Sequence, residues 1–375
     1  MQKTSTRYLT QPITRDLQKK MVLLGGPRQV GKTTLAMGLL KGKTDRYFNW
    51  DFDEDREKIL KRDWPALKGL IVFDELHKYH KWRNLLKGLF DKWRNEIQIL
   101  VTGSARLEFY RYSGDSLQGR YYSYHMHPLS MAELKITQLK DFNDLLALSG
   151  FPEPFFSGDL SEKKRWAMQY RSRLIREDVR DLERVSEIGS LERLALRLPE
   201  LVGSPLSLNN LREDLQMSHA TISRWCDILE RLYYLFRIYP FGAPKIRAVK
   251  KTAKHYHYDW SLVTESGPRL ENLVASHLLK WCHFEQDTLG RDLELRYFRD
   301  IDRREVDFVI LEEGKPIQFI ECKNHGKEIS RGLVYLKQRF PKVDAIQLTL
   351  EEGIDRINNQ GIRRYSLIEF LASLH

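Results

Sequence analysis

Glycines, a lysine and threonines follow an early apolar segment with the spacing of a phosphate-binding loop. The stretch Gly26-x4-Gly31-Lys32-Thr33 fits the pattern G-x-x-x-x-G-K-[ST], between the apolar run MVLLGG and the amphipathic segment KTTLAMGLLKG. Backbone N–H groups of such a loop converge on phosphate oxygens, and the helix that follows adds its positive end. We expect a nucleoside triphosphate here, with Lys32 on the β- and γ-phosphates and the Thr33 hydroxyl on Mg²⁺. The residues expected to contact the nucleotide are Gly26, Pro27, Arg28, Gln29, Val30, Gly31, Lys32, Thr33 and Thr34.

A second apolar segment, LIVFDEL, ends in two acids. Asp74 can hold the Mg²⁺ shell together with Thr33, and Glu75 can orient or activate the attacking water. The pair therefore predicts hydrolysis of the nucleotide rather than binding alone. A third apolar segment, IQILVTGS, ends in hydroxyls, of which Thr102 or Ser104 could sense the γ-phosphate. Capping is the alternative explanation for these hydroxyls.

Two carboxylates and a lysine lie in an apolar hairpin near the end of the chain. The stretch VDFVILEEGKPIQFIECK predicts two strands joined by a turn at residues 312–316. Asp307 lies in the first strand, and the period of two places Glu321 and Lys323 on one face of the second. With Glu271 on an upstream helix, the layout resembles the PD-(D/E)xK nucleases, in which carboxylates hold Mg²⁺ and the lysine orients a water. Three interpretations stay open: an active nuclease, a nuclease fold that only binds nucleic acid, and an unrelated charged hairpin.

A pair of short helices is predicted before that hairpin, over the sequence SLNNLREDLQMSHATISRWCDILERL. Ser207 and Ser218 can cap the two helices, and YLFRIYPF then follows as a wing strand, which together fit a winged helix-turn-helix. The start of the second helix and the basic tail PKIRAVKKTAK could contact a phosphate backbone. The residues put forward for nucleic acid are Thr221, Ser223, Arg224, Lys245, Arg247, Lys250, Lys251 and Lys254. A module used only for packing or oligomerisation is the alternative.

Composition limits the class of protein. The chain has 375 residues, 42% of them hydrophobic and 30% charged, which is typical of a globular protein with more than one domain. Its formal charge of +11 favours an anionic partner, with nucleic acid ahead of an acidic membrane. The three cysteines are far apart and lack a metal-ligand spacing. With no signal-like or membrane-spanning apolar run, we expect a cytoplasmic protein.

Several motifs together resemble the AAA-type P-loop ATPases of bacteria and archaea that carry a C-terminal domain of unknown function. They are GPRQVGKTTL, VFDELHKYHKW, TGSARLEFY, SLQGRYYSYHMHPLSMAEL, GFPEP and GPRLENLVASHLL, in the order that the family has. The resemblance implies an ATPase core, a winged helix and a nuclease-like C-terminal fold. It also makes Arg120 a candidate arginine finger for the γ-phosphate of a neighbouring subunit, with a structural salt bridge as the alternative.

These observations predict an α/β protein with four parts. We expect a P-loop parallel-sheet ATPase domain at residues 1–135, a helical linker or lid at 136–204, a winged helix with its basic tail at 205–254, and a restriction-endonuclease-like α/β domain at 255–375. The predicted function is an ATP-hydrolysing protein that remodels branched or duplex DNA, with ATP and Mg²⁺ as cofactors and a homo-oligomer, such as a ring, as the active form. A signalling or defence switch with a protein partner and an ATP-gated metal-dependent nuclease are the alternatives.

Overall fold

The structure is a computed structural model that describes residues 7–43, 45–63, 68–103, 117–179, 187–242, 252–323 and 328–374. The chain divides into two compact units, Met1–His127 with Arg231–Tyr233, and Pro128–Glu230 with Tyr234–His375. Five of the residues that the sequence puts forward as ligands lie outside the described residues: Ser104, Lys245, Arg247, Lys250 and Lys251.

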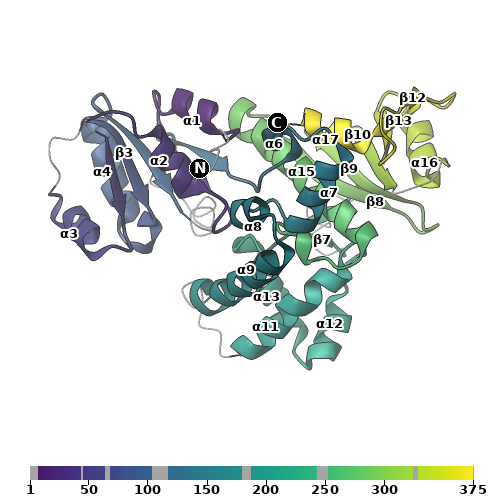
Figure 1. Cartoon of the computed structure of the whole chain (residues 1–375), viewed down its shortest axis with the longest axis horizontal. Coiled ribbons are helices and arrows are strands. Elements are labelled where there is room, and N and C mark those ends of the chain that lie inside the picture. The colour runs from purple at the N-terminus through teal and green to yellow at the C-terminus, as the bar shows by residue number, and fades with distance from the viewer. Residues whose placement is uncertain are drawn as a thin grey trace. The chain divides into compact units, whose positions relative to one another are not determined.

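The first unit is built on a parallel sheet of five strands in the order β2-β3-β4-β1-β5, as the alternation of apolar runs and amphipathic segments predicts. Figure 1 shows helices α2 and α4 against this sheet. Its elements in chain order are α1 (Thr10–Asp16), β1 (Met21–Gly25), α2 (Lys32–Leu39), β2 (Arg46–Asn49), α3 (Asp53–Lys61), β3 (Gly69–Asp74), the 3₁₀ turn η1 (Leu76–Lys78), α4 (Trp82–Trp93), β4 (Ile97–Thr102) and β5 (Tyr121–His125).

The strand order of this sheet positions the polar residues at its carboxyl edge. Strand β4 lies between β1 and β3, and its last residue, Thr102, is in register with Leu24 on one side and Asp74 on the other. Helix α4 buries four side chains, Trp82, Leu85, Leu86 and Leu89, at the spacing of one helix face. These join Phe73 and its neighbours in one apolar core, so the strand that carries Asp74 is fixed from the α4 side.

The second unit begins with a helical part. Its elements are α6 (Met131–Leu134), α7 (Leu139–Leu148), α8 (Pro152–Ser157), α9 (Leu160–Arg173), the π-helical turn η3 (Leu174–Asp178), α11 (Ile188–Arg197), the 3₁₀ turn η4 (Leu198–Leu201), α12 (Leu208–Leu215) and α13 (His219–Arg231). The two predicted caps are present: Ser207 Oγ accepts from the Asn210 N–H and Ser218 Oγ accepts from the Thr221 N–H. Gln216, at φ 54°, makes the turn between α12 and α13.

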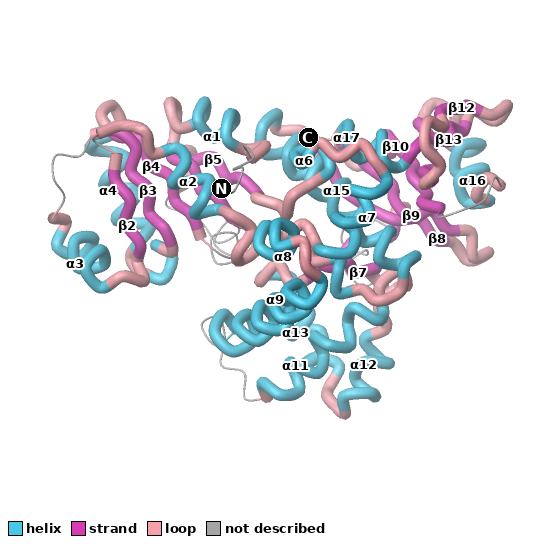
Figure 2. The backbone as a smooth tube through the Cα atoms, in the orientation of Figure 1, coloured by secondary structure: helices cyan, strands magenta, loops and turns pink. Residues whose placement is uncertain are grey.

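A mixed sheet of eight strands in the order β12-β13-β11-β10-β9-β8-β6-β7 forms the rest of the second unit. Figure 2 shows β8, β9 and β10 as neighbouring strands. The remaining elements are β6 (Leu235–Pro240), β7 (Lys254–His257), the 3₁₀ turn η5 (Trp260–Leu262), α15 (Ser266–Leu289), β8 (Leu293–Arg299), β9 (Glu305–Glu312), β10 (Lys315–Lys323), α16 (Arg331–Arg339), β11 (Asp344–Thr349), β12 (Asp355–Ile357), β13 (Ile362–Ser366) and α17 (Leu367–Ser373).

Two predictions about this sheet have different outcomes. Strands β9 and β10 form the predicted antiparallel hairpin. The predicted wing strand is instead β6, which pairs with β7 on one side and with β8 on the other and so lies inside the large sheet. Leu235, Phe236 and Ile238 of β6 are buried and lie along β7, whereas Tyr239 and Pro240 make the pairing with β8.

Helix α16 packs closely on the hairpin. Leu333 and Leu336 of α16 share an apolar cluster with Val306 of β9 and Phe319 of β10. Gly332 permits this approach, since a Cβ added at Gly332 would lie 2.0 Å from the backbone oxygen of Glu305.

We therefore predict that Gly332→Ala destabilises the protein by about 1–3 kcal/mol, because backbone rather than a flexible side chain has to move. The matched control is Gly189→Ala, which is also the second residue of its helix but has no atom within 4 Å of the added Cβ. That control should be neutral or gain up to about 1 kcal/mol from helix propensity. Chemical unfolding of both variants measures the difference, and equal midpoints would contradict the close packing of α16.

Candidate functional site

The loop between β1 and α2 has the backbone conformation of a phosphate-binding loop. Gly26 and Gly31 have φ values of 149° and 100°, and helix α2 begins at Lys32 directly after Gly31. A Cβ added at Gly26 would lie 2.3 Å from the Met126 carbonyl oxygen. Both glycines are therefore required by the local geometry, as the sequence motif predicts.

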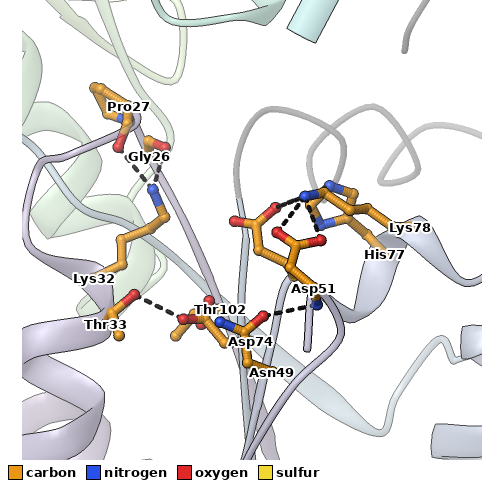
Figure 3. A network of polar contacts seen from close by, with 11 residues as sticks. Gly26, Pro27, Lys32, Thr33, Asn49, Asp51, Asp74, His77, Lys78 and Thr102 are labelled. Atoms are coloured by element: carbon orange, nitrogen blue, oxygen red, sulfur yellow. Dashed lines mark hydrogen bonds and ion pairs between the residues drawn. The ribbon is translucent and has the colours of Figure 1, made fainter. Parts of the chain in front are cut away.

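Lys32 and Arg7 connect this loop to its surroundings. The buried Lys32 ammonium donates to the carbonyls of Gly26 (2.9 Å) and Pro27 (2.7 Å), as Figure 3 shows. Arg7 donates from Nη1 to the Val30 carbonyl at 2.6 Å and from Nη2 to the His127 carbonyl at 2.5 Å. Arg7 thus fixes the tip of the loop. Sequence reasoning missed this residue because it lies 23 positions before its partner and in no motif.

Asp74 is the centre of the polar network at the sheet edge. Its Oδ2 accepts hydrogen bonds from Thr33 Oγ1 (2.7 Å) and Tyr47 Oη (2.8 Å), and its Oδ1 accepts from Thr102 Oγ1. Burial, with the Asp74 charge second, raises the pKa of Tyr47, so the phenol remains a donor. Thr102, which we considered as a γ-phosphate sensor, is fully buried and directs its hydroxyl to Asp74.

The pair Thr33 and Asp74 fits a magnesium ion in its chemistry. Both supply hard oxygen atoms, and they lie within hydrogen-bond distance of one another across 41 residues of sequence. Mg²⁺ in nucleotide sites is commonly held by one or two protein oxygens, with phosphate and water filling the other positions. The two residues would hold the ion beside the loop, where it would neutralise charge on the phosphates.

Glu75 lies next to Asp74 in a left-handed backbone conformation, with φ at 56°. Its N–H donates to the Thr102 carbonyl at 3.1 Å, and its carboxylate lies 3.6 Å from Lys78 Nζ and 3.7 Å from His77 Nε2. Lys78 also forms an ion pair with Asp51 at 2.6 Å, drawn in Figure 3. Burial raises the pKa of Glu75, and the positive charge of Lys78 opposes that shift. A carboxylate with a raised pKa is a better acceptor for a proton from water.

The other predicted nucleotide contacts have mixed surroundings. Pro27 and Val30 are buried, Arg28 and Gly31 are half-buried, and Gln29, Thr33 and Thr34 are exposed. Arg120 forms an ion pair with Asp91 of α4, with Nε 2.7 Å from Oδ1. The salt bridge that we left open for Arg120 therefore exists within this chain, and an arginine-finger role stays a prediction.

The hairpin of the second unit brings the predicted carboxylates together. The Cys322 N–H donates to Asp307 Oδ2 at 2.8 Å, and the Asp307 N–H donates to Glu321 Oε2 at 3.3 Å. Lys323 Nζ lies 3.4 Å from Glu321 Oε1. Glu271 of α15 completes the group, since its charge and that of Glu321 add to burial in raising the pKa of Asp307 well above the usual range for aspartate. Glu305 lies nearby, since it and Glu271 both form ion pairs with Lys254, and we call Glu271, Glu305, Asp307 and Glu321 the carboxylate cluster.

One prediction about this region is corrected by the structure, and a second stays a prediction. Lys254 does not extend the basic tail toward solvent: it is the first residue of β7, is buried, and forms ion pairs with Glu271 and Glu305. Among the residues that the structure describes, no group of three or more His, Cys, Asp or Glu side chains is arranged to hold a metal ion. Glu271, Asp307 and Glu321 accept hydrogen bonds from backbone N–H groups, Tyr256 and Lys254, and their role as metal ligands stays a prediction.

At the start of α13 the predicted nucleic-acid contacts differ in exposure. Arg224 is exposed, whereas Thr221 and Ser223 are half-buried. The Thr221 hydroxyl lies 2.8 Å from Ser218 Oγ, so it belongs to the helix cap.

In the described part of the chain, no helix is both long and apolar enough to cross a bilayer.

Comparison with known proteins finds distant relatives. An uncharacterised protein of Mycobacterium tuberculosis is 24% identical over 329 residues, which cover 84% of this chain and 72% of that protein. An uncharacterised protein of Methanocaldococcus jannaschii is 25% identical over 335 residues, with 71% of this chain and 69% of that protein covered.

Solved structures give weaker similarities. Thermotoga maritima RuvB has a TM-score of 0.29 at 15% identity, covering 63% of this chain and 89% of that one. The Aeropyrum pernix ORC1 protein, solved in complex with DNA, has a TM-score of 0.32 at 14% identity, covering 73% of this chain and 92% of that one.

Family models divide the chain into three consecutive matches. Residues 139–267 match a domain of unknown function (DUF8612), and residues 266–367 match another (DUF4143). Residues 18–135, which contain the phosphate loop, Asp74 and Glu75, match an AAA domain. The nucleotide site described above is therefore the site of an AAA-type P-loop domain.

Proposed function

We propose that this protein hydrolyses ATP in its N-terminal unit and uses the hydrolysis to remodel nucleic acid, with branched or duplex DNA as the substrate. The observation that carries the proposal is the Asp74 carboxylate, which is hydrogen-bonded to Thr33 of the phosphate loop and followed directly by Glu75. A loop that only bound phosphate would not need an acid in that second position.

The chain's own residues divide the work of hydrolysis. The N–H groups that open α2 and the Lys32 ammonium bind the phosphates, since Lys32 can exchange two neutral carbonyl partners for charged oxygens. Thr33 and Asp74 would hold Mg²⁺, which would supply positive charge beside the phosphates. Glu75 accepts a proton from, or orients, the attacking water, and its partly buried carboxylate is held near Lys78.

Nucleic-acid binding rests on the capped helix pair and on charge. Helices α12 and α13 are joined by a turn of three residues, as helix-turn-helix pairs are, and the N-terminal half of α13 carries the exposed Arg224. Residues 161–254 contain 19 lysines and arginines against 12 aspartates and glutamates. A local excess of positive charge of this kind favours a polyanion.

A second copy of this chain is the expected partner for Arg120.

Gly26→Ala should weaken nucleotide binding, because the added Cβ collides with the Met126 backbone and the loop has to shift. A cost of about 1–3 kcal/mol corresponds to a loss of roughly 5- to 150-fold in affinity. Titration with a fluorescent ATP analogue measures it. The control is Gly38→Ala in α2, where no atom lies within 4 Å of the added Cβ and affinity should be unchanged. A Gly26→Ala protein with wild-type affinity would contradict the assigned loop.

Glu75→Gln should retain ATP binding and lose hydrolysis by roughly 10²–10⁴-fold, because glutamine cannot accept the proton of the attacking water. Phosphate release and analogue binding are measured on the same sample. Glu57→Gln on the exposed face of α3 is the control and should hydrolyse ATP at the wild-type rate. If both variants turn over at the same rate, Glu75 is not the base.

Arg224→Ala should reduce the affinity for duplex and four-way-junction DNA. The slope of the logarithm of the binding constant against the logarithm of the salt concentration should fall by about one, since one phosphate contact is lost. ATP hydrolysis with and without DNA is measured in parallel, with stimulation expected in the wild type. Arg193→Ala on α11 removes another exposed arginine and serves as the control. If DNA does not change the rate of ATP hydrolysis and the wild type does not bind DNA at low salt, the nucleic-acid part of the proposal is wrong. The ATPase part is unaffected by that result.

A further inference from the structure

Lys254 is a buried lysine inside the carboxylate cluster. Only 1% of its side chain is exposed, and its ammonium lies 2.6 Å from Glu305 Oε1 and 3.1 Å from Glu271 Oε1. Removing a charge from water costs free energy unless the charge is paired, so these two ion pairs are what allows Lys254 to be buried.

The neighbours of Lys254 fix its ammonium in one place. Tyr256, two residues along β7, donates its hydroxyl to Glu271 Oε1 at 2.6 Å, so the two side chains converge on the same carboxylate. The ring of Tyr297 lies on another side, with its centroid 5.6 Å from Lys254 Nζ. The Tyr297 hydroxyl in turn donates to the Thr252 carbonyl at 2.7 Å, two residues before Lys254.

The carboxylates of the cluster are engaged by groups of this chain. Glu271 accepts from Lys254 and Tyr256, Asp307 accepts from the Cys322 N–H, and Glu321 accepts from the Asp307 N–H and faces Lys323. A divalent ion bound here would lie beside a buried ammonium of the same charge sign, which repels it.

We propose that the Lys254 ammonium is the built-in cation of the carboxylate cluster and excludes a divalent metal ion from it, so that the C-terminal sheet is a metal-free module and not a metal-dependent nuclease. This inference is independent of the proposed ATP hydrolysis and DNA binding.

A catalytic role for Lys254 itself is disfavoured by exposure. Lys323, the lysine of the predicted nuclease motif, has 43% of its side chain exposed and can meet a molecule from solvent, whereas Lys254 cannot. The contrast separates a lysine at the surface of the cluster from one that fills its interior.

The test is divalent-ion binding to the full chain without nucleotide, measured by Mn²⁺ electron paramagnetic resonance and by thermal unfolding with Mg²⁺ or ionic-strength-matched NaCl. The wild type and Asp307→Asn should bind Mn²⁺ to the same extent. The Tm of the wild type should be the same in Mg²⁺ and in NaCl. Lys254→Met should lower the Tm by roughly 10 °C, because the half-buried carboxylates of Glu271 and Glu305 lose their buried counter-charge. Mg²⁺ or Mn²⁺ should then restore at least half of that loss by entering the vacated position.

A second buried lysine supplies the matched control. Lys280 is 2% exposed and forms an ion pair with Glu133 at 2.5 Å. Lys280→Met should also lower the Tm, but Lys280 lies outside the carboxylate cluster, so the added metal should restore less of the loss than it does in Lys254→Met.

Three results would overturn the proposal. They are wild-type Mn²⁺ binding that Asp307→Asn abolishes, Mg²⁺-dependent cleavage of DNA or RNA that Asp307→Asn abolishes, and a metal response in Lys254→Met no larger than that in Lys280→Met. If Lys254→Met does not fold, the comparison of wild type with Asp307→Asn decides alone.

Discussion

Three hydroxyl groups from three elements converge on the carboxylate of Asp74. Thr33 comes from α2, Tyr47 from β2 and Thr102 from β4, and the three bonds use both carboxylate oxygens. This convergence requires the observed strand order, since β4 has to separate β1 from β3 for Thr102 to reach Asp74. A carboxylate held by several donors keeps one orientation, so the position of Asp74 beside the phosphate loop is set before any ligand arrives.

Two buried lysines show how the choice of partner decides what a charge can do. Lys32 donates to backbone carbonyls, which are neutral and therefore weaker partners for an ammonium than a phosphate would be. Lys254 lies between the carboxylates of Glu271 and Glu305, which already supply full negative charge. The first lysine can change partners at little cost, whereas the second is committed to the fold.

The parts of the structure that the sequence predicted are local ones. The phosphate loop, the strand ending at Asp74 and the β9–β10 hairpin are each encoded within a short stretch, because turn glycines and apolar periodicity act over a few residues. The position of β6 was not predictable in this way: its partner β8 lies more than 50 residues away, and a buried strand reads the same beside a helix pair or inside a sheet. Lys254 was misassigned because it follows a basic run. The signal that could have placed it is the run His255-Tyr256-His257-Tyr258 directly after it, which is typical of a buried strand.

The role proposed for Glu75, a base in hydrolysis, places two opposing requirements on its surroundings. The carboxylate has to be held in place, yet a strong hydrogen bond to a cation would remove its tendency to accept a proton. Lys78 lies 2.6 Å from Asp51 but 3.6 Å from Glu75, which is beyond hydrogen-bond distance. Asp51 thus takes the direct contact with the lysine, and Glu75 receives only its longer-range attraction. Burial raises the pKa of Glu75 despite that attraction, so the carboxylate keeps the tendency to accept a proton that its proposed role requires.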